Sequence, residues 1–269
     1  MNCFHYSRRK TSGLFRLKGD GFNVTCICDW LDDKHGDYKD VERWCLKWNT
    51  SKEDLLIVLG DNGVNYWGPH RDKKLKNYLS SLPITFFMIK GNHDQRPSSK
   101  LYHVAQEKAH PLIRGTCLVE KDYPSLLFSA MYGGYEFLCG NQWLRTFVLG
   151  GAYSADKWYR LDMQAMGHSE YRWFADEQMN NWEMKEASSM IYDYQPDYVL
   201  SHTCPFRYIP RDMFLPIVDQ STVDDTMEHW MDSVEDEIPY VKWYCGHWHT
   251  DRIVDQVRYM YNDIVLLGE

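Results

Sequence analysis

Two short, uninterrupted apolar runs stand out in the first third of the chain, at 55–59 and 84–89. Turn-forming residues bound each run, which is the pattern of strands buried on both faces of a parallel sheet. Apolar residues recur at helical spacing over 41–48 and 75–82, so two amphipathic helices are expected. With a first strand inside 24–31, this order predicts a β-α-β-α-β unit whose strands end at one edge of a sheet.

Further apolar runs predict more elements toward the C-terminus. Strands are expected at 126–128, 146–149, 198–200 and 241–245, and helices at about 177–191 and 222–238. These elements require a second layer. No internal repeat and no long linker interrupts the pattern, so we expect one domain over 23–269, preceded by an N-terminal extension at 1–22.

Candidate ligand residues follow directly after predicted strands. They are Asp33 and His35, then Asp61, Asn92 and His202, and finally His247 and His249. Because open α/β sheets bind ligands at the carboxyl ends of their strands, we expect these residues to meet in one crevice. Two Asp, one Asn and four His combine oxygen with imidazole, which suits Mn, Fe, Zn or Ni better than Ca or an all-oxygen Mg site. Seven protein ligands suffice for two metal ions if one carboxylate bridges them.

The charge of the chain limits its partners. The formal net charge is −8, which gives no general attraction to nucleic acid or to an anionic membrane. Two divalent ions beside two Asp carboxylates would still leave the site positive, so an anionic ester can bind there. We therefore expect a small anionic ester as the partner, and a nucleic acid stays possible although the charge does not indicate it.

The cysteines and the N-terminus bear on localisation. The 8 cysteines contain no C-x-x-C pair, so they are expected to be reduced thiols. No apolar run approaches the roughly 20 residues of a membrane span, and no secretion signal follows the basic start of the chain. A cytoplasmic protein is the default expectation. The basic stretch 7–18 is read as an ordinary extension, with a transit peptide as the alternative.

The chain resembles the calcineurin-like metallophosphoesterases through five pieces that occur in that family's order. They are Asp33-Lys34-His35-Gly36, Gly60-Asp61, Gly91-Asn92-His93-Asp94, His202, and Gly246-His247-Trp248-His249. Three longer pieces, at 59–65, 150–157 and 201–205, resemble a bacterial and phage branch of the family. The resemblance implies an α/β fold in which a β-sandwich is flanked by helices in four layers, α/β/β/α. The metal site would lie at the carboxyl ends of the strands.

The resemblance also implies a role for each motif residue. The first metal would be bound by Asp33, His35, Asp61 and His249, and the second by Asp61, Asn92, His202 and His247. Asp61 would be the bridging carboxylate. His93 would contact the phosphate or protonate the leaving group, with Asp94 orienting it.

Two features of the sequence leave choices open. The strand before the first motif is interrupted by Asp29, which is an alternative to Asp33 as the first carboxylate; we favour Asp33 because its motif runs without a gap into the next helix. Three further residues are candidates for contact with the substrate: Asn65, Tyr153 and Arg160.

The predicted function is a binuclear metal-dependent phosphoesterase. A metal-bridging hydroxide would attack a phosphomonoester or a phosphodiester, and the choice between the two stays open. Two divalent transition-metal ions are expected, manganese first, with iron, zinc and nickel as alternatives. The alternative function is a catalytically weak metal- or nucleotide-binding protein of the same fold, suggested by the irregular first motif. The sequence does not indicate an oligomeric state.

Overall fold

The computed structural model describes residues 25–28, 38–97, 102–105, 110–214 and 220–269. Within them, the strands form two seven-stranded sheets. The first sheet contains, in spatial order, β14 (Val265–Leu266), β1 (Thr25–Cys28), β2 (Leu55–Val58), β3 (Thr85–Met88), β7 (Leu126–Phe128), β6 (Cys117–Glu120) and β4 (Tyr102–Ala105). The second contains β12 (Arg252–Val254), β13 (Val257–Tyr259), β11 (Lys242–Cys245), β10 (Tyr198–Ser201), β9 (Gln142–Leu149), β8 (Tyr132–Cys139) and β5 (Ile113–Arg114).

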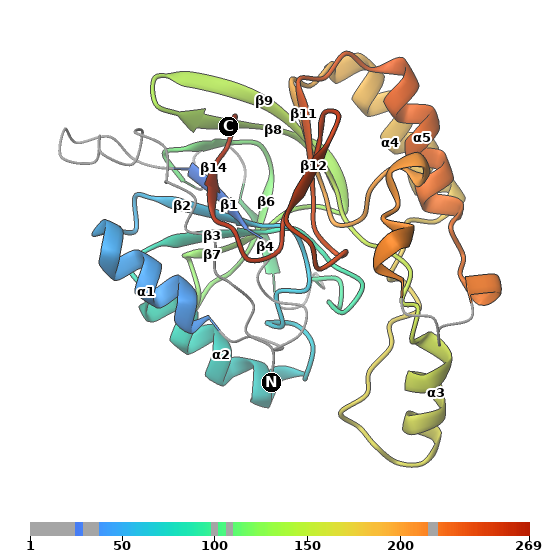
Figure 1. The fold of residues 1–269 in the computed structure, drawn as a ribbon. Helices are drawn as coiled ribbons and strands as arrows, with labels where there is room; N and C mark the ends of the chain where they lie inside the picture. Colours follow the sequence, from blue (N-terminus) through green and yellow to red (C-terminus); the bar gives the residue numbers. More distant parts are fainter. Residues whose placement is uncertain (1–24, 29–37, 98–101, 106–109, 215–219) are drawn as a thin grey trace, which may run out of the picture.

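Helices cover the outer face of each sheet (Figure 1). The helices are α1 (Lys39–Trp48), α2 (Pro69–Ser81), α3 (Lys157–Ala165), α4 (Asn181–Tyr194) and α5 (Thr226–Glu237), with short 3₁₀ turns at Phe206–Tyr208, Arg211–Met213 and Gln220–Thr222. Helices α1 and α2 pack on the first sheet, and α4 and α5 on the second. This is the predicted four-layer α/β/β/α fold, and it is confirmed.

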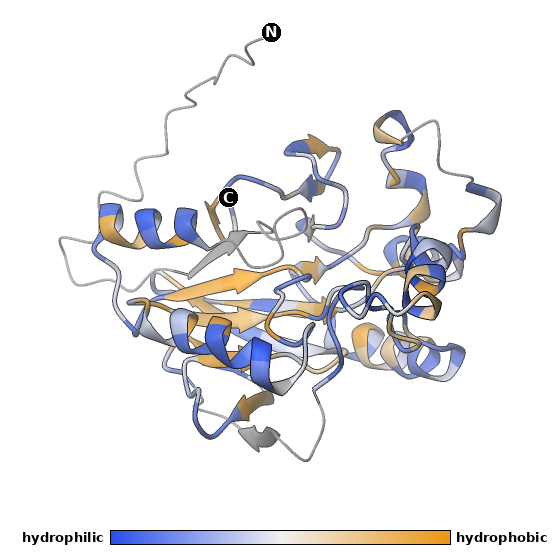
Figure 2. Cartoon of the chain, turned by 90° about the horizontal axis from the view of Figure 1, so that it is seen from below, coloured by the Kyte–Doolittle hydropathy of each residue, from blue (hydrophilic) through white to orange (hydrophobic). Residues whose placement is uncertain are grey.

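Three apolar clusters explain why the central strands are apolar on both faces. Ile57 of β2 packs in the cluster between the sheets, together with Val148 and Leu200 of the second sheet. Its neighbour Val58 points the other way, into the cluster with Val41 of α1. Successive residues of a strand face opposite sides, so a strand between two cores has no polar position. Figure 2 shows these strands as the most hydrophobic segments of the molecule.

The parallel strands place the candidate site. Strands β1, β2 and β3 pair in parallel in the first sheet, as the β-α-β-α-β pattern predicts. Strands β9, β10 and β11 pair in parallel in the second sheet. The ligand-bearing loops therefore come from both sheets, and the carboxyl ends of the two groups of strands meet at one place.

Two predicted helix starts are wrong and one segment is not described. Helix α5 begins at Thr226 instead of near 222. Helix α4 begins at Asn181 instead of near 177, because the side chain of Asn180 accepts hydrogen bonds from the backbone N–H groups of Trp182 and Glu183. Glu183 bonds back to the Asn180 backbone, which completes a capping box. The predicted extension at 1–22 lies outside the described residues. None of the helices in the described ranges has the length and apolar character needed to cross a membrane.

Candidate metal centre

The loop after β2 brings Asp61 close to the loops after β3 and β10. Gly60, with φ of +123°, lies so near His202 that a Cβ atom there would be 2.1 Å from Nδ1 of the ring. A Cβ on Gly91 would be 2.0 Å from Oδ1 of Asp61. Both positions therefore require glycine, because no side chain fits between the backbone and these two residues.

Backbone strain is concentrated at the predicted ligands. Asp61, His247 and His249 all have positive φ, at 45°, 67° and 48°. A residue other than glycine in this region costs of order 1–3 kcal/mol, and such residues cluster at functional sites. Only three other described non-glycine residues have positive φ, namely Asn49, Gln195 and Asp255. The strained backbone at these three residues is a sign of function that does not depend on any motif.

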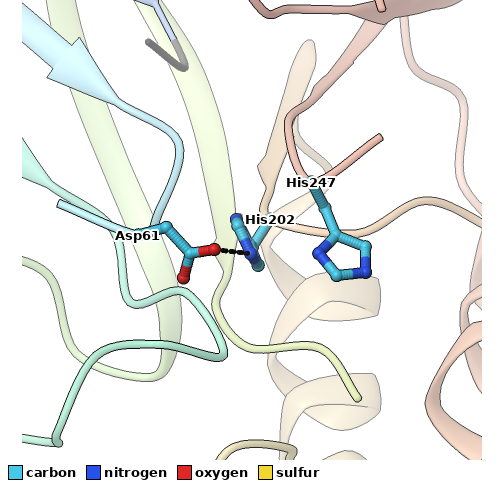
Figure 3. A group of neighbouring side chains, drawn as sticks. All are labelled: Asp61, His202 and His247. Carbon is cyan, nitrogen blue, oxygen red and sulfur yellow. Dashed lines mark ion pairs between the residues drawn. The ribbon is translucent and has the colours of Figure 1, made fainter. Parts of the chain in front are cut away.

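His202 is fully buried, and its ring orientation is set by the backbone. Its Nδ1 lies 2.7 Å from the carbonyl oxygen of Leu59, which can only accept, so Nδ1 carries the ring hydrogen. In the neutral ring, Nε2 then presents a lone pair. It lies 2.8 Å from Oδ1 of Asn92, which is also an acceptor. It lies 3.4 Å from Oδ2 of Asp61, another acceptor, and Figure 3 marks this contact.

His247 lies on the other side of His202 from Asp61 and is the next candidate ligand (Figure 3). One ligand atom each from Asp61, His202 and His247 lie within 4.8 Å of one another, which is close enough to hold a metal ion. Desolvation keeps the pKa of His247 well below its usual range, and the neighbouring His202 lowers it further. The His247 ring is therefore neutral and able to bind a metal. Carboxylate, amide oxygen and two imidazoles form a donor set that suits a divalent transition metal.

His93 lies beside this group. Its backbone N–H donates to Oδ1 of Asp61 at 2.8 Å. Its Nε2 lies 3.3 Å from both Nη2 of Arg160 and Nδ2 of Asn92, and because these are donors, Nε2 is the acceptor. Desolvation lowers the pKa of His93 to about 4, Asp61 opposes this effect, and the charge of Arg160 adds to it. The ring is neutral at pH 7, so a general-acid role requires its pKa to rise when substrate binds.

Asp94 joins the loops after β2 and β3. Its carboxylate accepts hydrogen bonds from the backbone N–H groups of Asn62, Gly63 and Gly91, and from the Asn62 side chain. Burial raises the pKa of Asp94 to about 6, and the nearby Asp61 adds to the shift. These contacts hold the loops in place and do not involve the His93 side chain. A catalytic role for Asp94 stays a prediction.

Comparison with known proteins identifies the family. The sequence profile described as calcineurin-like phosphoesterase matches residues 23–267. The chain belongs to this family. Membership indicates a function of the phosphoester-hydrolase type. No curated protein is significantly similar to the chain.

Among solved structures, the chain of this calcineurin-like phosphoesterase is similar to a phosphopantetheinyl hydrolase from Mycobacterium tuberculosis, with 13% sequence identity and a TM-score of 0.43. The match covers 89% of this chain and 88% of the other. At this TM-score the likeness carries no inference about the substrate.

The predicted ligands of the first metal are placed only in part. His249 stacks on Tyr261, with ring centroids 5.2 Å apart, and lies outside the group of Asp61, His202 and His247. Asp33, His35 and the alternative Asp29 lie outside the described residues. The ligand set of the first metal therefore stays a prediction.

Of the three candidate substrate contacts, Arg160 lies against the site. It is 7% exposed, and Nε of its guanidinium donates to Asp156 at 2.7 Å. Nη1 donates to the Tyr66 hydroxyl at 2.9 Å and to the backbone oxygen of Arg172 at 3.3 Å. Nη2 is the atom beside His93. The guanidinium is thus fixed on two sides, and its third side faces the motif histidine.

The other two candidate contacts have different surroundings. The hydroxyl of Tyr153 donates to the backbone oxygen of Thr222 at 2.9 Å, and the residue is buried. Asn65 lines a small cavity of about 10 Å³ together with Lys90 and Asp94. Contact of either residue with a substrate stays a prediction.

Two residues beside the site were not singled out from the sequence. Ser154 hydrogen-bonds to Asn92, and Glu177 hydrogen-bonds to Ser154. Ser154 falls within the piece at 150–157 that resembles a branch of the family, so a weak signal existed for it. Glu177 follows no predicted strand and carries no motif, so the sequence offers no signal for it.

Proposed function

We propose that this chain is a metal-dependent phosphoesterase in which Asp61, Asn92, His202 and His247 bind a divalent transition-metal ion. The observation that carries the proposal is the meeting of acceptor atoms around Nε2 of His202. Nδ1 of that ring is hydrogen-bonded to a carbonyl, so in the neutral ring Nε2 faces Oδ1 of Asn92 and Oδ2 of Asp61 with a lone pair. A cation between them turns this unfavourable arrangement into a binding site.

A second ion is part of the proposal. Asp33, His35 and His249 would bind it, with Asp61 as the bridge, and manganese is the first candidate, followed by iron, zinc and nickel. Divalent ions in this position supply Lewis-acid chemistry, activating water and stabilising charge on the phosphoryl oxygens. The substrate is proposed to be a small phosphate ester or a nucleotide, as a monoester or a diester.

Arg160 is proposed to bind the substrate phosphate beside His93. A guanidinium has five N–H donors in a fixed plane. Four of these N–H groups are used in the hydrogen bonds to Asp156, Tyr66, Arg172 and His93. One N–H of Nη2 can therefore donate to a phosphate oxygen without breaking the contacts that hold the side chain. Such preorganised donors contribute most where water is excluded, and Arg160 is buried.

A dianionic phosphate next to His93 would also change that ring. The negative charge favours the protonated imidazole, so substrate binding is expected to raise the pKa of His93 from about 4. Protonation of Nε2 would end its role as acceptor from Arg160 and Asn92, and the ring could then donate to the leaving-group oxygen, as the resemblance implies.

A substrate screen tests the proposal. Manganese-loaded protein is assayed against paired phosphomonoesters and phosphodiesters, cyclic nucleotides, dinucleotides and short nucleic acids. The variant Asp61→Ala is compared with His229→Ala, which removes an exposed histidine on α5 that stacks on Phe206. We expect hydrolysis of at least one ester class, its loss in Asp61→Ala and its retention in His229→Ala. Bound metal without turnover of any ester would overturn the proposed enzymatic activity and favour a binding protein.

A further inference from the structure

A buried chain of hydrogen bonds leads from the metal group into the protein. Nδ2 of Asn92 donates to Oγ of Ser154 at 2.9 Å, and that Oγ donates to Oε2 of Glu177 at 2.5 Å. The three residues are 2%, 1% and 3% exposed, so water does not offer alternative partners. This chain of hydrogen bonds joins the loop after β3 to the segments before α3 and before α4.

The direction of each bond follows from the groups involved. An ionised carboxylate only accepts, so the Ser154 hydroxyl spends its single hydrogen on Glu177. Its oxygen is then left as an acceptor, and it can pair only with the NH₂ side of the Asn92 amide. Oδ1 of Asn92 must therefore point the other way, toward Nε2 of His202 at 2.8 Å. The carboxylate thus decides which end of the amide faces the metal group.

The backbone around these three hydrogen-bonded residues leaves their side chains little room to move. Nζ of Lys90 donates to the backbone oxygens of Gly91 and Glu177, at 2.9 and 3.2 Å. The backbone N–H of Gly151 donates to the Lys90 oxygen at 2.7 Å. A Cβ on Gly151, where φ is +88°, would be 2.3 Å from the Glu177 oxygen. The three segments are therefore in direct backbone contact, and the Ser154 N–H also donates to Oε1 of Glu177 at 3.2 Å.

We propose that Ser154 and Glu177 are positioning residues that fix the Asn92 amide with its oxygen toward the metal ion. The inference rests on the proposed metal-dependent function. Without the hydrogen bond to Ser154, only the 3.3 Å contact of Nδ2 with His93 favours this orientation, and the amide can turn over more easily. Nδ2 would then donate to Nε2 of His202 and occupy the lone pair that the metal needs. Partners that orient a ligand in this way commonly change metal affinity or activity by about 10- to 100-fold.

The test measures Mn²⁺ affinity by calorimetric titration of metal-free protein. Ser154→Ala and Glu177→Leu remove the acceptor at each step, whereas Glu177→Gln retains a carbonyl oxygen for the Ser154 hydroxyl. The matched control is Thr146→Val, which removes a fully buried hydroxyl that donates to the backbone oxygen of Tyr135. Thermal melting of each metal-free variant reports any general loss of stability.

We expect Ser154→Ala and Glu177→Leu to weaken Mn²⁺ binding by about 10- to 100-fold, and Glu177→Gln to lie nearer the wild type. Thr146→Val should lose stability without losing affinity. If Glu177→Leu does not fold, Ser154→Ala decides the result, because it removes only one oxygen atom. Wild-type affinity in Ser154→Ala would overturn this inference alone, whereas a wild-type protein that binds neither Mn²⁺ nor Fe²⁺, Zn²⁺ or Ni²⁺ would overturn the proposed function as well.

Discussion

The loops that follow strands and the segment 150–177 both place buried polar groups at the site, but they contribute in different ways. The strand-end loops supply Asp61, Asn92, His202 and His247, whose acceptor atoms converge. The segment 150–177 supplies no member of that group. It supplies Ser154, which contacts Asn92 of the group, and Arg160, which contacts the neighbouring His93.

This difference explains why one region is readable from the sequence and the other is not. A strand end fixes the position and direction of the next few residues, so a ligand can be expected there from the strand pattern alone. The segment 150–177 also begins after a strand, β9, but it continues through an irregular stretch, helix α3 and a second irregular stretch. Which of its side chains reach the site depends on how the chain folds back, and local sequence does not encode that path.

The largest expected effect tests the strand-end region. Gly91→Ala places a Cβ 2.0 Å from Oδ1 of Asp61, so the loop must shift and the metal group should be lost. Gly140→Ala is the control: Gly140 has positive φ, at +59°, so this variant carries backbone strain, but its Cβ would have nothing within 4 Å. Metal content and thermal melting are measured for both. Equal metal binding in the two variants would show that the close approach at Gly91 does not matter.

A smaller effect tests the segment 150–177. Arg160→Lys keeps the charge but loses the planar set of donors, so the contacts with Tyr66 and the phosphate cannot both persist. We expect kcat/KM to fall by about 100-fold with Mn²⁺ affinity unchanged. Arg207→Lys, at an exposed arginine beside Asp232 and Asp236, is the control and should have little effect. A loss of metal affinity in Arg160→Lys would instead assign Arg160 to the support of the metal group.

The smallest effect measures how the two regions are coupled. In metal-free protein, Arg160→Gln removes a positive charge from beside His93, so protonation of the ring becomes easier and its pKa should rise above about 4. An NMR titration of the His93 ring measures this shift, with Arg207→Gln as the control.

The low pKa of His93 in the folded wild-type protein also affects the stability of the fold. The unfolded chain takes up a proton at the ordinary pKa of 6.5, whereas the folded chain does so only near 4. The wild-type protein therefore loses stability as pH falls from 6.5 through 4. This loss should be smaller in Arg160→Gln, and an unchanged pKa of His93 would show that Arg160 does not act on the ring.

Much of the fold could be predicted from the hydrophobic pattern. The runs at 55–59 and 84–89 become β2 and β3, because strands with a core on each face leave no polar position. The start of α4 was placed too early, although the Asn180-x-x-Glu183 capping box was readable in the sequence.

The site could be predicted only in part. Gly60 and Gly91 occur in the motif pieces, but the close approach of the backbone to His202 and Asp61 that requires them is visible only in the structure. Glu177 could not be found, because its role depends on a three-residue chain of contacts formed only in the folded protein. The orienting role of Asp94 is implied by the resemblance and stays a prediction, and its contacts with the surrounding loops are visible only in the structure.

Direct titration of Mn²⁺ into metal-free wild-type protein and into His202→Ala tests the central claim most closely. His202 is fully buried, and its Nε2 is the atom around which the acceptors of Asn92 and Asp61 gather. We predict saturable Mn²⁺ binding by the wild type and loss of at least one bound ion in a folded His202→Ala protein. Equal stoichiometry and affinity in the two proteins would contradict the assignment of this group as a metal centre.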